Sequence, residues 1–324
     1  MFILIKKFSW ALLFAFLILS SAAGSGYSEV RVHGSFVGIP FPSKAIELYE
    51  KSGDVKVDQI GKNKALINLA GGSCDIAIST WAIDQLDDAA VLDAMAEARK
   101  KGISFEETPM VIDAIVPIVH KDNPVRKLSL EQLHKIYTGK IRKWHDIDPA
   151  ISVDIPIEVL STTEGGDGKY IIWADLVING TSADDVGYGK GPKDMGAFVA
   201  SDDHRWSIGY DSMHYIKVDT NSSKPYKAKS IDIVTLTNNE KLKMGPSAEY
   251  PVSRYLYAVT RSDITKDADE FFDHLYKPSV QNLAYIVGQL PLPQDNDRGS
   301  SGCNAAFPAI AVLAFVPVFL FRKK

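Results

Sequence analysis

The first third of the chain repeats one pattern, in which a short β-branched or apolar run is followed by a polar loop and then by apolar residues at helical spacing. This pattern predicts three strand–loop–helix units over residues 30–49, 55–69 and 75–101, with Ser43 as the N-cap of the first helix. In open α/β sheets, ligands sit at the carboxyl ends of the strands, where the loops lead into helices. We therefore expect the polar loops after these three strands to contribute to a binding site.

Two further strands are predicted over residues 105–108 and 110–120, and the second is so continuously apolar that both of its faces are expected to be buried. Asp113 interrupts this apolar run. A carboxylate at this position is either a strand-edge residue or a residue of a hinge or pocket, and both interpretations stay open. The helix that follows is predicted to begin with a capping box formed by Ser129 and Gln132.

A glycine-rich stretch follows the next predicted strand, residues 156–160. Gly165, Gly166 and Gly168 lead directly into an apolar helical pattern. Such a turn leaves backbone N–H groups unpaired at a helix start, which suits an anion, although many glycine loops are ordinary strand-to-helix connections. Further elements are expected at residues 206–210, 231–236 and 255–260 (strands) and 267–276 (helix).

The beginning of the chain differs from its body. Lys6 and Lys7 precede an apolar run over residues 8–19, and small residues follow it. This is the order of charged, hydrophobic and small residues in a secretory signal peptide. We therefore expect residues 1–23 to be a signal peptide and the protein to be exported.

The last segment, residues 303–324, is separated from the body by a polar linker at 294–302. It begins with Cys303 and Asn304, continues as an uncharged apolar stretch and ends in three basic residues. A bilayer span needs roughly 17 to 25 residues, and a basic cluster favours a cytoplasmic end. A membrane helix is predicted, with a buried terminal helix as the alternative. The segment resembles the C-terminal sorting tails described in Synergistetes, which implies membrane retention, with or without later cleavage and surface attachment.

The body between these ends is acidic. Five of the 36 Lys and Arg residues lie in the end segments, which leaves 31 against 40 Asp and Glu and a formal charge of −9. This charge argues against nucleic acid as a partner, whereas a small anion can still bind through local dipoles. Cys74 is expected in the core and unpaired with Cys303, and the seven His show no metal-binding or catalytic spacing. No cofactor and no metal are expected.

The strand–loop–helix units fall into two groups, which predicts two α/β lobes with a site between them. The chain is expected to cross between the lobes near residues 112–117 and 250–255. The first lobe then comprises residues 24–112 and 253–293, and the second comprises residues 113–252.

Several short motifs run in a characteristic order over nearly the whole body. They are Gly34-Ser35, Lys64–Ile67, Cys74–Ser79, Asp113–Val116, Asp122–Pro124, Leu128–Leu133, Ile136–Lys140 with Trp144, Ile208–Tyr210, Tyr250–Arg254 and Gln281–Pro291. No single motif is specific, but the ordered set resembles the phosphate-binding proteins of ABC-type uptake systems, which have the type II periplasmic-binding fold. The resemblance implies a Venus-flytrap protein that closes two lobes around a dehydrated oxyanion and delivers it to an ABC permease.

The resemblance also implies ligand-binding residues. Ser35 and Phe36, in the first loop, which follows the first strand, lie at the family's first contact. Ser79 and Thr80, in the third loop, which follows the third strand, lie at the family's second contact. Lys62 lies in the second loop, which follows the second strand, where many members have a Gly/Ser contact loop.

The glycine-rich stretch departs from the family pattern, which has an Arg and then Gly-Ser-Gly-Thr. Here Thr163 replaces the Arg, Gly166 and Gly168 are retained, Asp167 replaces the Ser and Lys169 replaces the Thr. The fixed bidentate cation is lost, and Lys169 offers a mobile point charge instead. The carboxylate of Asp167 would repel a fully ionised oxyanion or accept the proton of a protonated one.

The leading hypothesis is therefore an exported, membrane-tethered, monomeric binding protein for phosphate or a related oxyanion. One alternative is a binding protein of altered specificity, for a cationic or neutral solute, and another is a surface sensor or scaffold. A surface phosphatase or esterase has less support, because no His-Glu-x-x-His or Gly-x-Ser-x-Gly motif is present. We expect a binding protein and not an enzyme.

Overall fold

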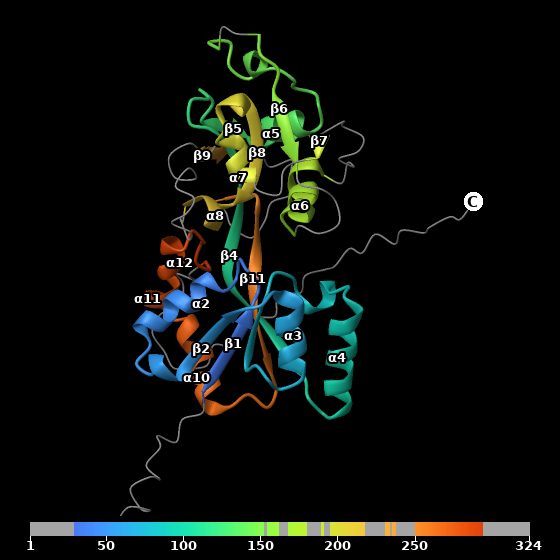
Figure 1. Cartoon of the computed structure of the whole chain (residues 1–324), viewed down its shortest axis with the longest axis vertical. Coiled ribbons are helices and arrows are strands. Elements are labelled where there is room, and N and C mark those ends of the chain that lie inside the picture. The colour runs from blue at the N-terminus through green and yellow to red at the C-terminus, as the bar shows by residue number, and fades with distance from the viewer. Residues whose placement is uncertain are drawn as a thin grey trace, which may run out of the picture. The chain divides into compact units, whose positions relative to one another are not determined.

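The computed structural model describes residues 29–151, 154–161, 168–179, 189–190, 195–217, 231–233, 235–237 and 250–293 (Figure 1). The predicted signal peptide and C-terminal tail lie outside these ranges. Within the described ranges, no helix combines the length and the apolar composition needed to cross a bilayer.

The first lobe is built on a mixed sheet. In this sheet β1 (Val30–Gly34) lies between β2 (Val55–Gln59) and β3 (Ile76–Ser79), and both pairings are parallel. Antiparallel β11 (Ser253–Arg261) follows β3 and pairs on its other side with β4 (Phe105–His120). The helices of this lobe are α2 (Pro40–Ala45), α3 (Lys62–Ala70), α4 (Ala89–Lys100), α10 (Lys266–Leu275), α11 (Pro278–Gln281) and α12 (Leu283–Ile286). The three predicted strand–loop–helix units are confirmed.

Two local predictions for this lobe are wrong. Ser43 does not cap the first helix, because α2 already begins at Pro40, where a proline fits since the first helical position needs no N–H donor. Residues 105–120 form one strand and not two. Pro109 is accommodated inside β4 because it faces the point where the register with β11 shifts between Leu256 and Tyr257.

β4 changes its partner along its length. Residues 105–114 pair with β11, and residues 115–120 pair with β8 (Ser207–Ser212) and β9 (Ile231–Ile233). Figure 1 shows β4 and β11 side by side as they run from one lobe into the other. All side chains from Met110 to His120 are buried, which explains the continuous apolar run.

The second lobe continues the sheet from β8. β6 (Glu158–Ser161) runs parallel to β8, and β7 (Gly189–Lys190) follows β6, while β5 (Lys127–Ser129) and β10 (Thr235–Thr237) form a separate pair. Its helices are α5 (Leu130–Tyr137), α6 (Gly168–Trp173), α7 (Met195–Val199) and α8 (Met213–Lys217), and α6 continues as one π-helical turn to Ile178. The predicted capping box of Ser129 and Gln132 is present at the start of α5.

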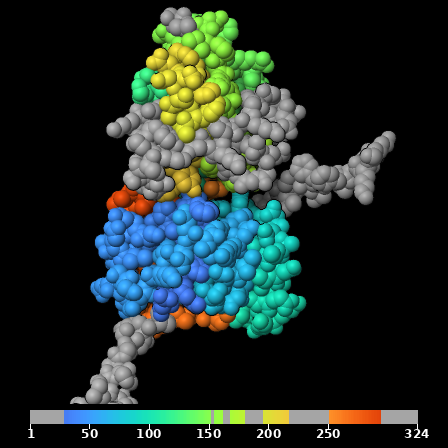
Figure 2. All heavy atoms as spheres, in the orientation of Figure 1, coloured from blue at the N-terminus to red at the C-terminus, as the bar shows by residue number. Residues whose placement is uncertain are grey.

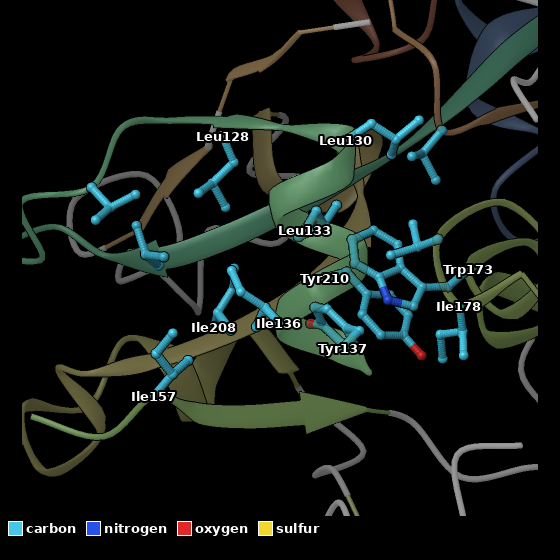
Figure 3. Packing of buried hydrophobic residues seen from close by; sticks show 14 of the residues in the cluster. Leu128, Leu130, Leu133, Ile136, Tyr137, Ile157, Trp173, Ile178, Ile208 and Tyr210 are labelled. Atoms are coloured by element: carbon cyan, nitrogen blue, oxygen red, sulfur yellow. The ribbon is translucent and has the colours of Figure 1, made fainter. Parts of the chain in front are cut away.

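An aromatic cluster fixes α6 against the second lobe (Figure 3). The rings of Trp173 and Tyr210 stack with centroids 4.1 Å apart, and Tyr137 meets Trp173 edge-on at 5.0 Å. The hydroxyl of Tyr137 also donates to the carbonyl of Leu160 at 3.1 Å. Because these rings are fully buried, the helix that begins at Gly168 is held on β6 and β8.

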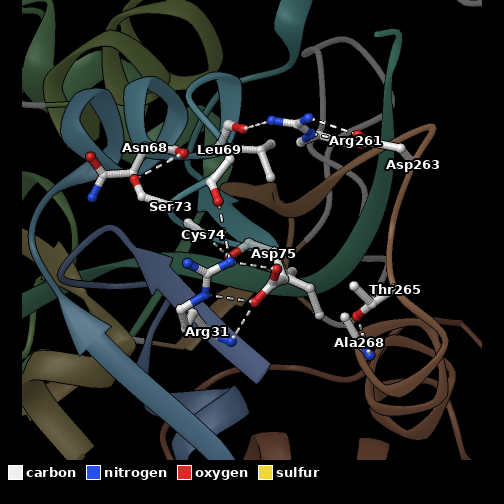
Figure 4. A network of polar contacts seen from close by, with 12 residues as sticks. Arg31, Asn68, Leu69, Ser73, Cys74, Asp75, Arg261, Asp263, Thr265 and Ala268 are labelled. Atoms are coloured by element: carbon white, nitrogen blue, oxygen red, sulfur yellow. Dashed lines mark hydrogen bonds and ion pairs between the residues drawn. The ribbon is translucent and has the colours of Figure 1, made fainter. Parts of the chain in front are cut away.

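Polar contacts hold the amino-terminal ends of β1 and β3 in the first lobe (Figure 4). Arg31 binds both carboxylate oxygens of Asp75, at 3.1 and 2.9 Å, and Arg261 donates to two carbonyls at the end of α3. Cys74 is buried beside this network, as predicted, and burial raises the pKa of its thiol to about 12. In Figure 2 the blue to cyan part of the chain, which ends with α4, forms one continuous surface.

Candidate ligand-binding site

The predicted contact loops of the first lobe meet at one edge of the sheet. The carboxyl ends of β1, β2 and β3 are neighbours because these strands are parallel. The N–H of Ser35 donates to the carbonyl of Ile78 at 3.0 Å, and the N–H of Gly61 donates to the carbonyl of Gly34 at 3.0 Å. The first loop is therefore tied to the third strand and to the second loop.

The first loop leaves Ser35 and Phe36 in different surroundings. Ser35 is buried, and its Oγ accepts from the N–H of Gly38 at 3.1 Å, whereas Phe36 is 58% exposed. A Cβ added at Gly38 would lie 2.4 Å from the side chain of Ile78. The loop thus packs closely on β3 and presents Phe36 outward.

The third loop uses the hydroxyl of Ser79 internally. Its Oγ donates to the carbonyl of Trp81 at 2.7 Å and accepts from the N–H of the same residue at 3.1 Å. The single O–H of Ser79 is therefore engaged in this conformation, and the turn holds Trp81 in place. Thr80 lies half-buried between them.

Trp81 lies beside two cations. The Lys62 ammonium, at the start of α3, is 5.7 Å from the centre of the indole ring, and the Arg254 guanidinium is 5.8 Å from it. Such distances allow cation–π attraction. Burial lowers the pKa of Lys62, with the charge of Arg254 acting in the same direction and those of Asp87 and Asp88 opposing it.

Arg254 forms a buried ion pair with Asp113. The two residues are directly opposite each other on β11 and β4, and Nε and Nη2 of Arg254 each lie 3.1 Å from Oδ2 of Asp113. Asp113 is fully buried and Arg254 is 8% exposed. Asp113 is therefore a residue of the crossing between the lobes. Of the two interpretations of this carboxylate, a hinge or pocket residue is the one that fits, and a strand-edge residue is not.

One nitrogen of this guanidinium has no partner in the described part of the chain. Nη1 of Arg254 is buried and makes no hydrogen bond. An unpaired donor of a buried guanidinium costs free energy unless a ligand or water satisfies it. This nitrogen lies near Gly168, because a Cβ added there would be 2.7 Å from Nη1 and 3.5 Å from the ring of Trp81. The start of α6, the crossing and the third loop thus meet at Nη1.

A chain of polar contacts links this ion pair to Lys169. Ser212 Oγ donates to Asp113 Oδ1 at 2.5 Å, and the N–H of Ser212 donates to Asp211 Oδ1 at 2.8 Å. Asp211 Oδ1 also accepts from the Lys169 ammonium at 2.6 Å. Because Lys169 and Asp211 are both largely buried, the charge of Lys169 is matched by a carboxylate of its own lobe.

Tyr215 lies against the same cluster. The Lys169 ammonium is 5.6 Å from the centre of its ring. Burial raises the pKa of the Tyr215 hydroxyl to about 12, and charges on Lys169, Asp113, Asp211 and Arg254 act on it more weakly. Four charged groups therefore lie near one half-buried tyrosine.

The structure places seven of the ten residues predicted for the site, and the other three lie outside the described residues. Ser35, Phe36, Lys62, Ser79 and Thr80 lie at the carboxyl edge of the first lobe, and Gly168 and Lys169 lie at the start of α6. Thr163, Gly166 and Asp167 lie outside the described ranges.

Sequence reasoning did not identify Arg254, Trp81 or Asp211 as site residues. The signal for Arg254 was available, because a charged residue in each of two predicted crossing segments is the pattern of a buried ion pair between them. Asp211 has no comparable signal, since only the fold brings it to Lys169.

Comparisons with known proteins identify the family and the fold. A family model described as PBP superfamily domain matches residues 19–279. The phosphate-binding protein PstS of Staphylococcus saprophyticus is 27% identical over 295 residues, covering 89% of this chain and 82% of the relative. Protein SphX of Synechococcus elongatus is 24% identical over 280 residues, covering 82% and 77%.

Among solved structures, an ABC-type phosphate transport receptor from Vibrio cholerae aligns with a TM-score of 0.51 and 20% identity, covering 82% of this chain and 100% of that one. At this identity the likeness is one of fold. Since the family model spans most of the chain, the protein belongs to the PBP superfamily domain family, and its fold is the two-lobed α/β fold of periplasmic binding proteins.

Proposed function

We propose that this protein is an exported solute-binding protein that captures phosphate or a related oxyanion between its two lobes and delivers it to an ABC-type transporter. The names of its relatives support this function, since several are phosphate-binding proteins PstS. It acts by binding and not by catalysis. The predicted lobes, residues 24–112 with 253–293 and residues 113–252, close on the ligand as β4 and β11 bend.

The observation that carries the proposal is the unpaired nitrogen of Arg254. Its guanidinium is buried and fixed by Asp113, and the remaining Nη1 is directed to the place where Gly168 and Trp81 meet. A donor fixed in this way suits an oxygen of a dehydrated anion. Arg254 thus supplies a fixed cation in place of the arginine that the family has at the position of Thr163.

We propose that the predicted ligand-binding residues contact the same anion as this nitrogen. Loop N–H groups and hydroxyls come from the first lobe, the cations come from Lys62 and Arg254, and the remaining contacts come from the start of α6. The proposed set is Ser35, Phe36, Lys62, Ser79, Thr80, Thr163, Gly166, Asp167, Gly168 and Lys169, extended by Arg254.

Isothermal titration with phosphate, arsenate, sulfate and molybdate tests the proposal. We expect one of these anions to bind. Arg254→Gln should weaken its binding about 10- to 150-fold, since a hydrogen bond to a charged group contributes about 1.5 to 3 kcal/mol. The exposed Arg142→Gln is the matched control and should bind as the wild type does. Failure of all four anions to bind would overturn the proposal.

A second candidate is a binding protein of altered specificity, and the Lys169–Asp211 pair favours it. The ammonium that replaces the family's threonine is 2.6 Å from a carboxylate, so its charge is already matched. Titration with amino acids, polyamines and small sugars separates the two candidates, because only altered specificity predicts that a cationic or neutral solute binds.

Export and tethering complete the proposed function. The signal peptide directs the monomeric protein out of the cytoplasm, and the apolar C-terminal tail holds it at the membrane beside its permease. Cell fractionation checks this: the full chain should be found with membranes, and a chain ending at residue 302 should be released. Recovery of both in the soluble fraction would contradict tethering.

A further inference from the structure

Trp81, in the third loop, is fixed in place from two sides. The hydroxyl of Ser79 donates to the carbonyl of Trp81 at 2.7 Å and accepts from its N–H at 3.1 Å. A Cβ added at Gly168 would lie 3.5 Å from the indole ring and 2.7 Å from Nη1 of Arg254. The indole is therefore held beside the start of α6, next to the nitrogen that we propose to bind the anion.

Two cations from different elements share this indole. The Lys62 ammonium, at the start of α3, lies over the ring at 5.7 Å from its centre, and the Arg254 guanidinium, on β11, lies over it at 5.8 Å. Burial lowers the pKa of Lys62, and the positive charge of Arg254 lowers it further, because like charges repel each other. Each cation is attracted to the negative face of the ring, so the indole offsets part of this repulsion.

The two cations differ in how firmly they are held. Arg254 is fixed by its buried ion pair with Asp113, whereas Lys62 forms no ion pair within the described ranges. The carboxylates of Asp87 and Asp88, which lead into α4, attract Lys62 from a distance. Lysine is a point charge on a flexible stem. Without the indole, we therefore expect the ammonium to turn toward these carboxylates.

We infer that Trp81 is a positioning residue of the proposed site, whose indole keeps the Lys62 ammonium beside Arg254 so that both cations serve one anion. The inference rests on the proposed function. A cation that is already in place needs no ordering when the anion arrives, so the ring raises the affinity without touching the anion. Trp81 has this role through its π face and not through its size.

Isothermal titration with phosphate, arsenate, sulfate and molybdate tests the inference on two variants. Trp81→Leu keeps an apolar side chain but removes the π face, and it should weaken binding about 5- to 30-fold, the range of one desolvated cation–π contact. Trp81→Phe keeps a π face and should bind within about threefold of the wild type. Equal affinities of the two variants would overturn the inference.

A double-mutant cycle shows whether Trp81 acts through Lys62. Lys62→Gln should cost about tenfold in affinity in the wild type, but less than about threefold in Trp81→Leu, where the ammonium is no longer in place. A merely structural role of Trp81 would leave the cost of Lys62→Gln unchanged. Lys100, whose side chain in the same lobe is 70% exposed, supplies the control, since Lys100→Gln should bind normally in both backgrounds.

The carboxylate of Asp167 needs its own test, because it adjoins Gly168 in the chain and lies outside the described residues. The cycle is therefore repeated in an Asp167→Asn background. The coupling between Trp81 and Lys62 should persist there, since it depends on the ring. Its disappearance would assign the placement of Lys62 to Asp167 and would overturn the inference.

The outcomes distinguish this inference from the function on which it rests. Circular dichroism and the urea midpoint show whether each variant folds, and Trp81→Met takes the place of Trp81→Leu if the latter does not. Costs that simply add in the cycle would overturn the role of Trp81 and leave anion binding intact. An absence of binding by all four oxyanions to the wild type would overturn both.

Discussion

Removing one partner of the Arg254–Asp113 ion pair should destabilise the protein far more than removing both. Arg254→Met leaves the fully buried carboxylate of Asp113 with the Ser212 hydroxyl but without a cation. Breaking a buried pair in this way costs about 3 to 5 kcal/mol, because the remaining charge is desolvated and unpaired. Asp113→Leu should cost a similar amount. The double variant should lie within about 2 kcal/mol of the wild type, since buried pairs replaced by apolar side chains are often neutral.

Urea unfolding followed by tryptophan fluorescence and by circular dichroism measures these differences, provided that the two transitions coincide. The single variants should also lose about 6 to 20 °C in melting temperature, at about 2 to 4 °C per kcal/mol for a chain of this size class. The coupling free energy from the double-mutant cycle should be at least about 3 kcal/mol.

The exposed pair of Lys143 and Asp154 is the matched control, because the two side chains are 48% and 74% exposed and their nearest charged atoms are 2.8 Å apart. The same cycle there should give less than about 1 kcal/mol. If Arg254→Met costs less than about 1 kcal/mol, or if the two single changes simply add, then the pair does not hold the crossing and the reasoning is refuted.

Three further predictions concern the site and the core of the first lobe. Because burial lowers the pKa of Lys62, this side chain loses its charge at a lower pH than a free lysine, whose pKa is about 10.5. Affinity for the bound anion should therefore fall as the pH rises toward that value; Lys62→Arg should remove this fall in a titration, and an unchanged slope would contradict it. Gly168→Ala should weaken anion binding about tenfold, because the new Cβ displaces Arg254 Nη1, whereas Gly53→Ala meets no atom within 4 Å and should bind normally. His274 donates to the carbonyl of Ala45 at 3.0 Å, and burial lowers the pKa of its imidazole. The stability that this histidine contributes is therefore full above about pH 6.5 and is lost as the pH falls through its folded pKa. His274→Gln should flatten the fall of the urea midpoint between about pH 7 and pH 5, and an equally steep fall in the variant would exclude this histidine as the cause.

Local features of the fold could be predicted because their causes are local. The capping box of Ser129 and Gln132 needs only residues within one helical turn, and it is present as expected. The apolar run from Met110 onward indicated a strand buried on both faces, and β4 is such a strand. The break predicted at Pro109 was wrong because the shifted register of β11, a partner more than 140 residues away in the chain, accommodates it.

The site was predicted in part for the same reason. Loops at strand ends can be read from the sequence, so Ser35, Lys62 and Ser79 were candidates, and they lie at one edge of the sheet. The pairings of Arg254 with Asp113 and of Lys169 with Asp211 span 141 and 42 residues. The charged residues in the two predicted crossing segments were a signal for the first pair, whereas nothing in the sequence specifies the second.

The sequence by itself determined the α/β class and the two groups of strand–loop–helix units, because the periodicity of apolar residues is a property of the chain alone. Only the tertiary structure decided which charged side chains are buried together. It brings Arg254 to the place where the lobes meet, pairs it with Asp113 and leaves Nη1 unpaired beside Gly168. Charge balance depends on which groups are buried together, and burial is a property of the folded chain.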